Sequence, residues 1–235
     1  MTGEVSSGAH NDSGKVVIAG TGRAGTTLLV QVLTDLGLDT GFEPAAPIDA
    51  GVNAGLERSV EGPDAPWIVK SPDLSRKLGA ILDAGRVRVE HVIIPIRDLD
   101  VAAASRIRNT KYGSDLHTWG GLLGTNRATR QRDALTGMLY ELLYTVARHD
   151  LDHTFLLFPR FTTDWEYTHA QLGFLAPDIS ADRWRQALAA RVKPALIHER
   201  PLSRTERGLT VMGTIYNRGI ARPVRVARRL MRAGR

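Results

Sequence analysis

Gly20 and Gly25 lie five residues apart, where a short apolar stretch changes to a helical pattern. Residues 16–19 read VVIA, and apolar residues recur at helical spacing from Thr26 onward. In a glycine-rich turn between a strand and a helix, several backbone N–H groups point toward the same place. This place lies at the positive end of the helix dipole, so the turn can bind phosphate. The spacing G-x-x-x-x-G therefore predicts a phosphate-binding loop over residues 20–27.

This loop lacks the lysine that loops binding nucleoside triphosphates carry. In those loops the lysine reaches the β- and γ-phosphates, and the hydroxyl after it holds magnesium. Here Thr26 occupies the lysine position, so a triphosphate would lose its main positive partner. Arg23, inside the loop, is the available replacement because its planar guanidinium always carries a charge that suits phosphate.

The whole pattern, G-x-x-R-x-G-T-T-x-L, resembles the 5′-phosphosulfate loop of sulfotransferases that use 3′-phosphoadenosine 5′-phosphosulfate (PAPS). The resemblance implies a three-layer P-loop fold. It also implies transfer of a sulfonate from PAPS, without a metal, to a hydroxyl of a small-molecule, carbohydrate or lipid acceptor. The residues implied to bind the 5′-phosphate are Gly22, Arg23, Ala24, Gly25, Thr26 and Thr27.

Two further segments extend the resemblance. In "HVIIPIRDLDVAAAS" a strand ends in Arg97 and Ser105 follows eight positions later, as in the segment that binds the 3′-phosphate in this family. Leu99 stands where the family usually has proline. "WIVKSP" is similar to the family's K-[ST]-P segment, which implies that Lys70, with Arg23, stabilises charge on the transferred sulfonate or the leaving phosphate.

Sulfonate transfer also needs a group that removes the acceptor's proton, and the family uses histidine or glutamate. Glu43, in "TGFEPAAP", lies twenty positions after Arg23, similar to the base position in the tyrosylprotein and glycan branches. Its neighbours Phe42 and Pro44 predict a partly desolvated carboxylate. His117, in "DLHTWGG", is the second candidate base.

Other interpretations of the same residues stay open. The glycines could simply link a strand to a helix, Arg97 could pair with a nearby carboxylate, and Lys70 could be an ordinary solvated lysine. A kinase with a variant P-loop would use Asp98 and Thr27 as magnesium ligands with ATP. A third possibility is a non-catalytic nucleotide-binding protein at a membrane.

The end of the chain carries the positive charge. Residues 208–235 contain seven arginines and no acid, so they account for the net charge of +6 and no nucleic-acid partner is expected. Arg218 and Gly219 are the only match to a late R-K-G segment that closes the 3′-phosphate site in some sulfotransferases. The arginine-rich stretch after Pro223 predicts either an amphipathic helix at an anionic membrane surface or a docked terminal helix with a solvated face.

Strands alternate with helices, which indicates an α/β fold with a parallel sheet covered on both faces. The predicted strands are residues 15–19, 67–70, 89–96 and 154–158, and the predicted helices are residues 26–36, 100–108, 129–148, 163–172 and 181–192. Asp100 is expected to cap the second of these helices, and Thr163 with Glu166 to form a capping box. Residues 44–66 and 111–124 are expected to lie over the active site.

Composition narrows the remaining choices. The chain has 235 residues and no cysteine, which excludes disulfides and thiolate chemistry, and its seven histidines show no metal-site spacing. We expect a disordered segment over residues 1–14 and one domain over residues 15–235 that ends in a basic tail from about residue 218. No apolar run approaches the ~20 residues of a membrane span, and the start has no secretory pattern, so a cytoplasmic location is expected, with peripheral contact at the inner membrane face.

Overall fold

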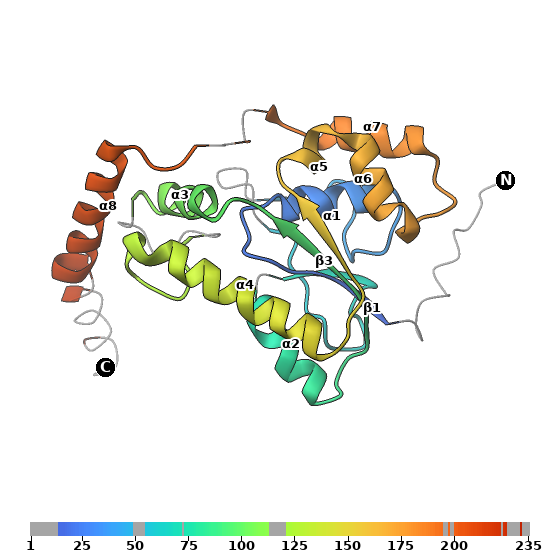
Figure 1. Cartoon of the computed structure of the whole chain (residues 1–235), viewed down its shortest axis with the longest axis horizontal. Coiled ribbons are helices and arrows are strands. Elements are labelled where there is room, and N and C mark those ends of the chain that lie inside the picture. The colour runs from blue at the N-terminus through green and yellow to red at the C-terminus, as the bar shows by residue number, and fades with distance from the viewer. Residues whose placement is uncertain are drawn as a thin grey trace.

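The computed structural model has a three-layer α/β fold, as the sequence predicted (Figure 1). It describes residues 14–48, 55–71, 73–112, 121–194, 197, 200–221, 223–224 and 231. Residues 1–13 of the segment expected to be disordered lie outside these ranges, whereas Gly14 is buried. Most of the arginine-rich end after Pro223 lies outside them too.

Four parallel strands form the central sheet, in the order β2-β1-β3-β4. They are β1 (Lys15–Ile18), β2 (Ile68–Lys70), β3 (Val89–Ile96) and β4 (His153–Leu157). The connection after β1 leads to β2 on one side, and the next leads to β3 on the other side of β1. The strand order therefore reverses between β1 and β3, and open α/β sheets bind ligands at the carboxyl ends of such a strand pair.

Helices cover both faces of the sheet because alternate residues of the strands enter two separate cores. Val16 and Ile18 of β1 pack into one core, and Val17 and Ala19 pack into the other. The first core is covered by α1 (Thr26–Asp35), α5 (Arg160–Thr163), α6 (Trp165–Leu172) and α7 (Ala181–Arg191), and the second by α2 (Leu74–Asp83) and α4 (Gln131–Arg148). Short 3₁₀ turns at Ala128–Arg130 and Gly173–Leu175 precede α4 and follow α6.

Two predicted helix caps are wrong by one or two residues. Helix α3 (Leu99–Asn109) begins after Asp98, whose Oδ1 accepts a hydrogen bond from the Val101 N–H at 2.9 Å, so Asp100 lies inside the first turn. Helix α6 is capped by Asp164, and Thr163 ends the preceding helix α5. In both cases a neighbouring aspartate takes the cap position instead of the predicted residue.

The last helix was not expected from the sequence. Helix α8 (Arg204–Tyr216) precedes the predicted tail, continues into a π-helical turn at Asn217–Ala221, and stands at one end of the molecule beyond α3 and α4 (Figure 1). Ser203 and Glu206 form its capping box. The Glu206 carboxylate also accepts hydrogen bonds from Arg108 Nε of α3 and Arg200 Nη1, each at 2.9 Å. Glu206 thus fastens α8 to the body.

Replacing Glu206 by glutamine is expected to loosen α8. Hydrogen bonds from Arg108, then the Ser203 backbone N–H, hold the pKa of Glu206 well below its usual 4.5. A lowered carboxyl pKa gives stability that is complete above about pH 4.5 and is lost as the pH falls further. Thermal melts should therefore show the variant below the wild type by a constant margin from pH 8 to 5, and a shrinking margin below that. Asp73→Asn, which breaks the exposed Asp73–Lys77 pair, is the control and should change little.

Candidate anion-binding site

The loop between β1 and α1 turns through three left-handed residues. Gly22, Arg23 and Gly25 have φ values of 66°, 57° and 77°. Glycine adopts this region freely, but an arginine there is uncommon and costs energy, which is typical of functional loops. The loop therefore holds the Arg23 backbone in a conformation that its own side chain disfavours.

Gly25 is the N-cap of α1 and has no side chain to satisfy the first N–H groups of the helix. Four N–H groups at a helix start have no partner within the helix, and a bound anion can accept from them. A Cβ at Gly25 would lie 2.6 Å from Phe161 Cζ, so this close approach of loop and core also requires glycine. The start of α1 is thus both exposed to a ligand and packed tightly behind.

Two residues outside the loop fix its backbone. Ser75 of α2 closes a pair of hydrogen bonds with Gly20: its Oγ accepts from the N–H at 2.9 Å and donates to the C=O at 2.8 Å. Arg106 of α3 is buried and donates from Nη2 to the Thr21 carbonyl at 2.5 Å and from Nη1 to the Gly121 carbonyl at 2.6 Å. Neither residue was predicted, because neither belongs to a local motif.

The two anion-binding segments predicted separately meet at the carboxyl ends of β1 and β3. Arg23 Nε donates to Ser105 Oγ at 3.2 Å. Arg97 Nη1 donates to the Arg23 carbonyl at 2.6 Å, and its guanidinium lies 4.7 Å from the centre of the Phe158 ring. The Asn109 amide, with its oxygen turned to the guanidinium, accepts from Arg23 Nη2 at 3.2 Å. Residues 74 or more positions apart thus form one cationic cluster.

Lys70 lies on the other side of α1's first turn. Its buried Nζ donates to Thr27 Oγ1 at 3.4 Å, to the Gly55 carbonyl at 2.7 Å and to Glu57 Oε1 at 2.5 Å. Sequence reasoning missed Glu57, because it lies in the long connection between α1 and β2, where no motif marks it. The ion pair places a carboxylate next to the loop.

Burial lowers the pKa values of several cations around the loop. Burial is the main cause for Arg23 and Lys70, and for Lys70 the Glu57 carboxylate offsets part of the effect. Burial, with repulsion from Arg23 and Arg76, lowers the pKa of Arg106 to about 9. A bound anion would reverse these shifts, because an opposite charge favours the charged form of each group.

The remaining predicted site residues lie apart from this cluster. Glu43 is exposed on a turn, so the desolvation expected from its apolar neighbours is absent. Arg58 ties this turn to the segment that carries Glu57: its Nη2 donates to the Gly41 carbonyl at 2.8 Å, and its guanidinium lies 4.4 Å from the centre of the Phe42 ring. The turn of Glu43 and the segment of Glu57 are therefore neighbours.

Four other predicted residues take no observed part in the cluster. His117 lies outside the described residues. Arg218 and Gly219 are exposed in the turn after α8, and within the described ranges no hydrogen bond or ion pair joins either to residues 20–27. Asp98, the magnesium ligand of the kinase interpretation, is exposed and has its carboxylate engaged as the α3 cap.

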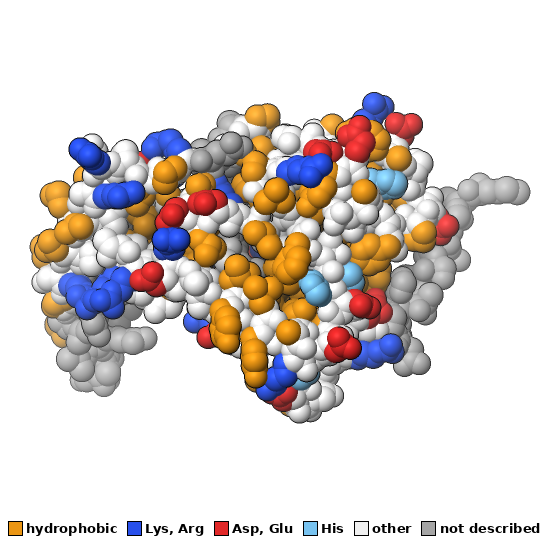
Figure 2. Space-filling model, viewed as in Figure 1, with side chains coloured by type: hydrophobic (Ala, Val, Ile, Leu, Met, Phe, Trp, Pro, Cys, Tyr) orange, Lys and Arg blue, Asp and Glu red, His pale blue; other side chains and the backbone are white. Residues whose placement is uncertain are grey.

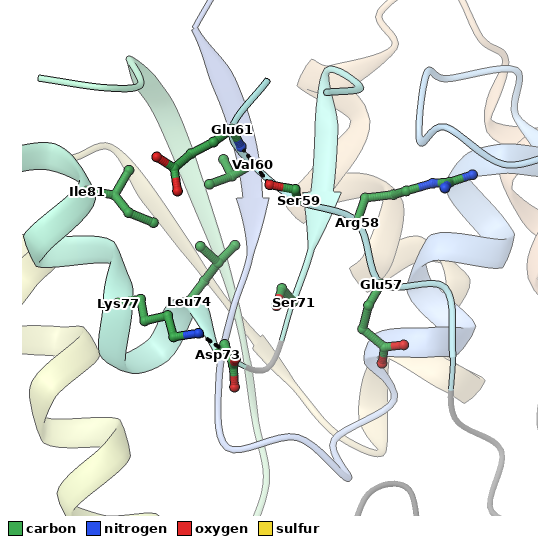
Figure 3. Close-up of a pocket in the computed structure, with 10 residues that line it drawn as sticks. All are labelled: Glu57, Arg58, Ser59, Val60, Glu61, Ser71, Asp73, Leu74, Lys77 and Ile81. Atoms are coloured by element: carbon green, nitrogen blue, oxygen red, sulfur yellow. Dashed lines mark hydrogen bonds and ion pairs between the residues drawn. The ribbon is translucent and has the colours of Figure 1, made fainter. Parts of the chain in front are cut away.

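A hollow of about 390 Å³ lies between residues 57–61, the end of β2 and α2 (Figure 3). Its lining is mostly polar and includes Ser59, Ser71 and the Lys77–Asp73 pair. In Figure 3 the Glu57 carboxylate points toward the start of α1, away from Glu61. Glu57 therefore lies between this hollow and the glycine-rich loop of residues 20–27.

Comparisons with protein-family models, with curated proteins and with solved structures give no match to this chain. The site is therefore interpreted from its own geometry: a glycine-rich loop at a helix start, three buried cations (Lys70, Arg97 and Arg106), the half-buried Arg23 and one adjacent carboxylate, Glu57.

Proposed function

We propose that the protein is a sulfotransferase that takes its sulfonate from PAPS. The observation that carries the proposal is the contact of Arg23 with Ser105 and of Arg97 with the Arg23 carbonyl, at 3.2 and 2.6 Å. It joins a loop suited to one phosphate with a second group of cationic and hydroxyl donors. A nucleotide with two separate phosphates has this distribution of charge.

The donor set fits such a ligand. The loop offers backbone N–H groups at an uncapped helix start, and the buried cations supply charge without acidic residues inside the loop sequence itself. Glycine at position 25 lets a ligand approach the backbone closely. PAPS, when bound, would supply an activated sulfonate on a phosphate leaving group.

Each side chain around the loop would have its own role in binding the donor or in the transfer step. The loop amides with Thr26 and Thr27 would hold the 5′-phosphate, and Arg97 with Ser105 the 3′-phosphate. Arg23 and Lys70 would stabilise the charge that grows on the leaving oxygen, since preplaced cations in a buried site act most strongly where charge develops. The polar hollow beside Glu57 would take the hydroxyl-bearing acceptor.

The contact with Lys70 favours Glu57 over Glu43 as the group that accepts the acceptor's proton. Glu57 is paired with Lys70 at 2.5 Å, and its side chain is 27% exposed, so it is reachable from the hollow. A sulfonate or phosphate near Lys70 would compete with this ion pair. The carboxylate released from Lys70 is then placed to receive a proton.

Glu57→Gln is expected to lower kcat by about 10²- to 10⁴-fold, the usual range for loss of a general base. Affinity for 3′,5′-adenosine bisphosphate should stay equal or rise, because Lys70 loses a competing partner. Glu43→Gln, the same chemical change on the neighbouring turn, is the matched comparison. Full activity in the Glu57 variant with loss in the Glu43 variant would return the role to Glu43.

The proposal is tested first by thermal melts with 3′,5′-adenosine bisphosphate, with and without magnesium, and with ATP plus magnesium. Ligand at ~100 times its Kd adds about 2.7 kcal/mol, which for a chain of this size is a rise of about 5–10 °C in Tm. We expect this rise with the bisphosphate regardless of magnesium. A rise with ATP and magnesium alone would instead support phosphoryl transfer.

A further inference from the structure

The polarity of helix α8 is reversed relative to an ordinary surface helix. The positions that face the body share small or polar side chains: Glu206, Thr210, Gly213 and Asn217 are buried. From Leu209 onward most solvent-facing positions are apolar: Leu209, Val211, Met212, Ile215 and Tyr216 of α8 and Ile220 of the turn after it are exposed, Met212 by 67% and Ile215 by 64%. A surface helix normally turns its apolar stripe inward, so the outward stripe of α8 is free for another apolar medium.

Figure 2 shows hydrophobic side chains gathered along the outer edge of α8, with Lys and Arg side chains beside them. Arg207 lies in α8 and Arg218 in the π-helical turn that follows it, and both are exposed. A helix with an apolar face and an arginine flank has the composition of helices that lie in a membrane interface.

The positive charge at the end of the chain indicates an anionic partner for α8. After Glu206 the chain has 29 residues with eight arginines and no acid. A second copy of this chain would bring the same arginines together and repel, whereas anionic lipid headgroups attract them. Within the described residues no helix is both long and apolar enough to cross a membrane. Helix α8 has 13 residues, fewer than the ~20 that a membrane-spanning helix needs, so contact through it would be peripheral.

We propose that the exposed face of α8 docks on an anionic membrane surface, with its apolar residues in the headgroup region and the exposed Arg207 and Arg218 on the lipid phosphates. This inference is independent of the sulfotransferase proposal, because it uses none of the residues around the loop. Membrane contact would bring the loop site to a surface that carries lipid or glycolipid hydroxyls.

Sedimentation of the full chain with vesicles tests the proposal. We expect binding to phosphatidylcholine vesicles that contain 30% phosphatidylglycerol, weak binding to phosphatidylcholine alone, and loss of binding in 1 M salt, where the Debye length is about 3 Å. Met212→Asp/Ile215→Asp should weaken binding by about tenfold or more, since it places charge in the apolar face. Both positions are exposed, so the variant should fold.

Tyr140→Asp/Tyr144→Asp is the matched control, because it removes two exposed aromatic residues from α4 and leaves α8 intact. It should bind the anionic vesicles like the wild type. Absence of binding to anionic vesicles would overturn the proposal. So would unchanged binding of the α8 variant, which would show that the arginines act alone, or a dimer in light scattering that the α8 variant dissociates.

Discussion

Arg23→Ala is expected to weaken binding of 3′,5′-adenosine bisphosphate by about 100-fold, near the upper end for losing a hydrogen bond to a charged group. The guanidinium is half-buried beside Ser105 and Asn109, so solvent replaces its contacts only in part. Turnover should fall further, by about 10²- to 10³-fold beyond binding, if Arg23 also stabilises the leaving oxygen. Calorimetric titration and steady-state rates measure the two effects separately.

Arg23→Lys and Arg185→Ala complete this experiment. Lysine keeps the charge but cannot make the forked contacts of a guanidinium, so affinity should recover only in part. Arg185 is an exposed arginine of α7, paired with Asp182, and its loss should leave binding unchanged. If Arg23→Ala binds the bisphosphate normally, the loop does not hold a phosphate and the proposed function fails with it.

Gly25→Ala is expected to destabilise the fold strongly for a change of one methyl group. The residue has φ of 77°, and a Cβ there would lie 2.6 Å from Phe161 Cζ and 3.0 Å from Phe158 Cδ2. The left-handed backbone costs an alanine about 1–2 kcal/mol, and overpacking of the core about 1–3 kcal/mol more. For a chain of this size the melting temperature should fall by about 5–15 °C.

Gly37→Ala separates the two causes. Gly37 has φ of 85°, close to that of Gly25, but nothing lies within 4 Å of its Cβ position. Its substitution should therefore show the backbone cost alone, about 1–2 kcal/mol. Equal destabilisation by both substitutions would mean that the contact with Phe161 relaxes at no cost. Bisphosphate binding should be lost only in the Gly25 variant, since Gly37 is distant from the loop in the chain.

The sheet and its helices were predictable where the chemistry is local. The apolar stretches of β1 and β3 and the loop spacing each fit one pattern, and β3 was predicted with its observed bounds. Helix α2 was not predicted, although its buried residues Leu74, Leu78 and Ile81 recur at helical spacing in an otherwise polar sequence and pack on α4. Helix α8 was also not predicted, although Ser203 and Glu206 match a capping box and Leu209, Met212 and Tyr216 recur at helical spacing. What the sequence does not show is that this apolar stripe faces outward.

The site was predictable only in the parts that a motif carries. Arg23, Lys70, Arg97 and Ser105 were named from the sequence, and the structure gathers them around residues 20–27. Ser75 and Arg106 contact the loop from more than 40 positions away in the sequence, and Glu57 acts through its ion pair with Lys70. Sequence spacing does not indicate contacts of this kind. The function assigned to the cluster stays a prediction until ligand binding is measured.

The hydrogen bond from Arg97 to the Arg23 carbonyl has a kinetic consequence. It attaches the end of β3 to the middle of the loop, while Ser75 and Arg106 hold the same loop at Gly20 and Thr21. The loop is thus anchored to three separate elements before any ligand arrives. Binding of an anion would therefore need no prior ordering of the loop. Its rate of association would then depend on diffusion and on attraction by the surrounding positive charge.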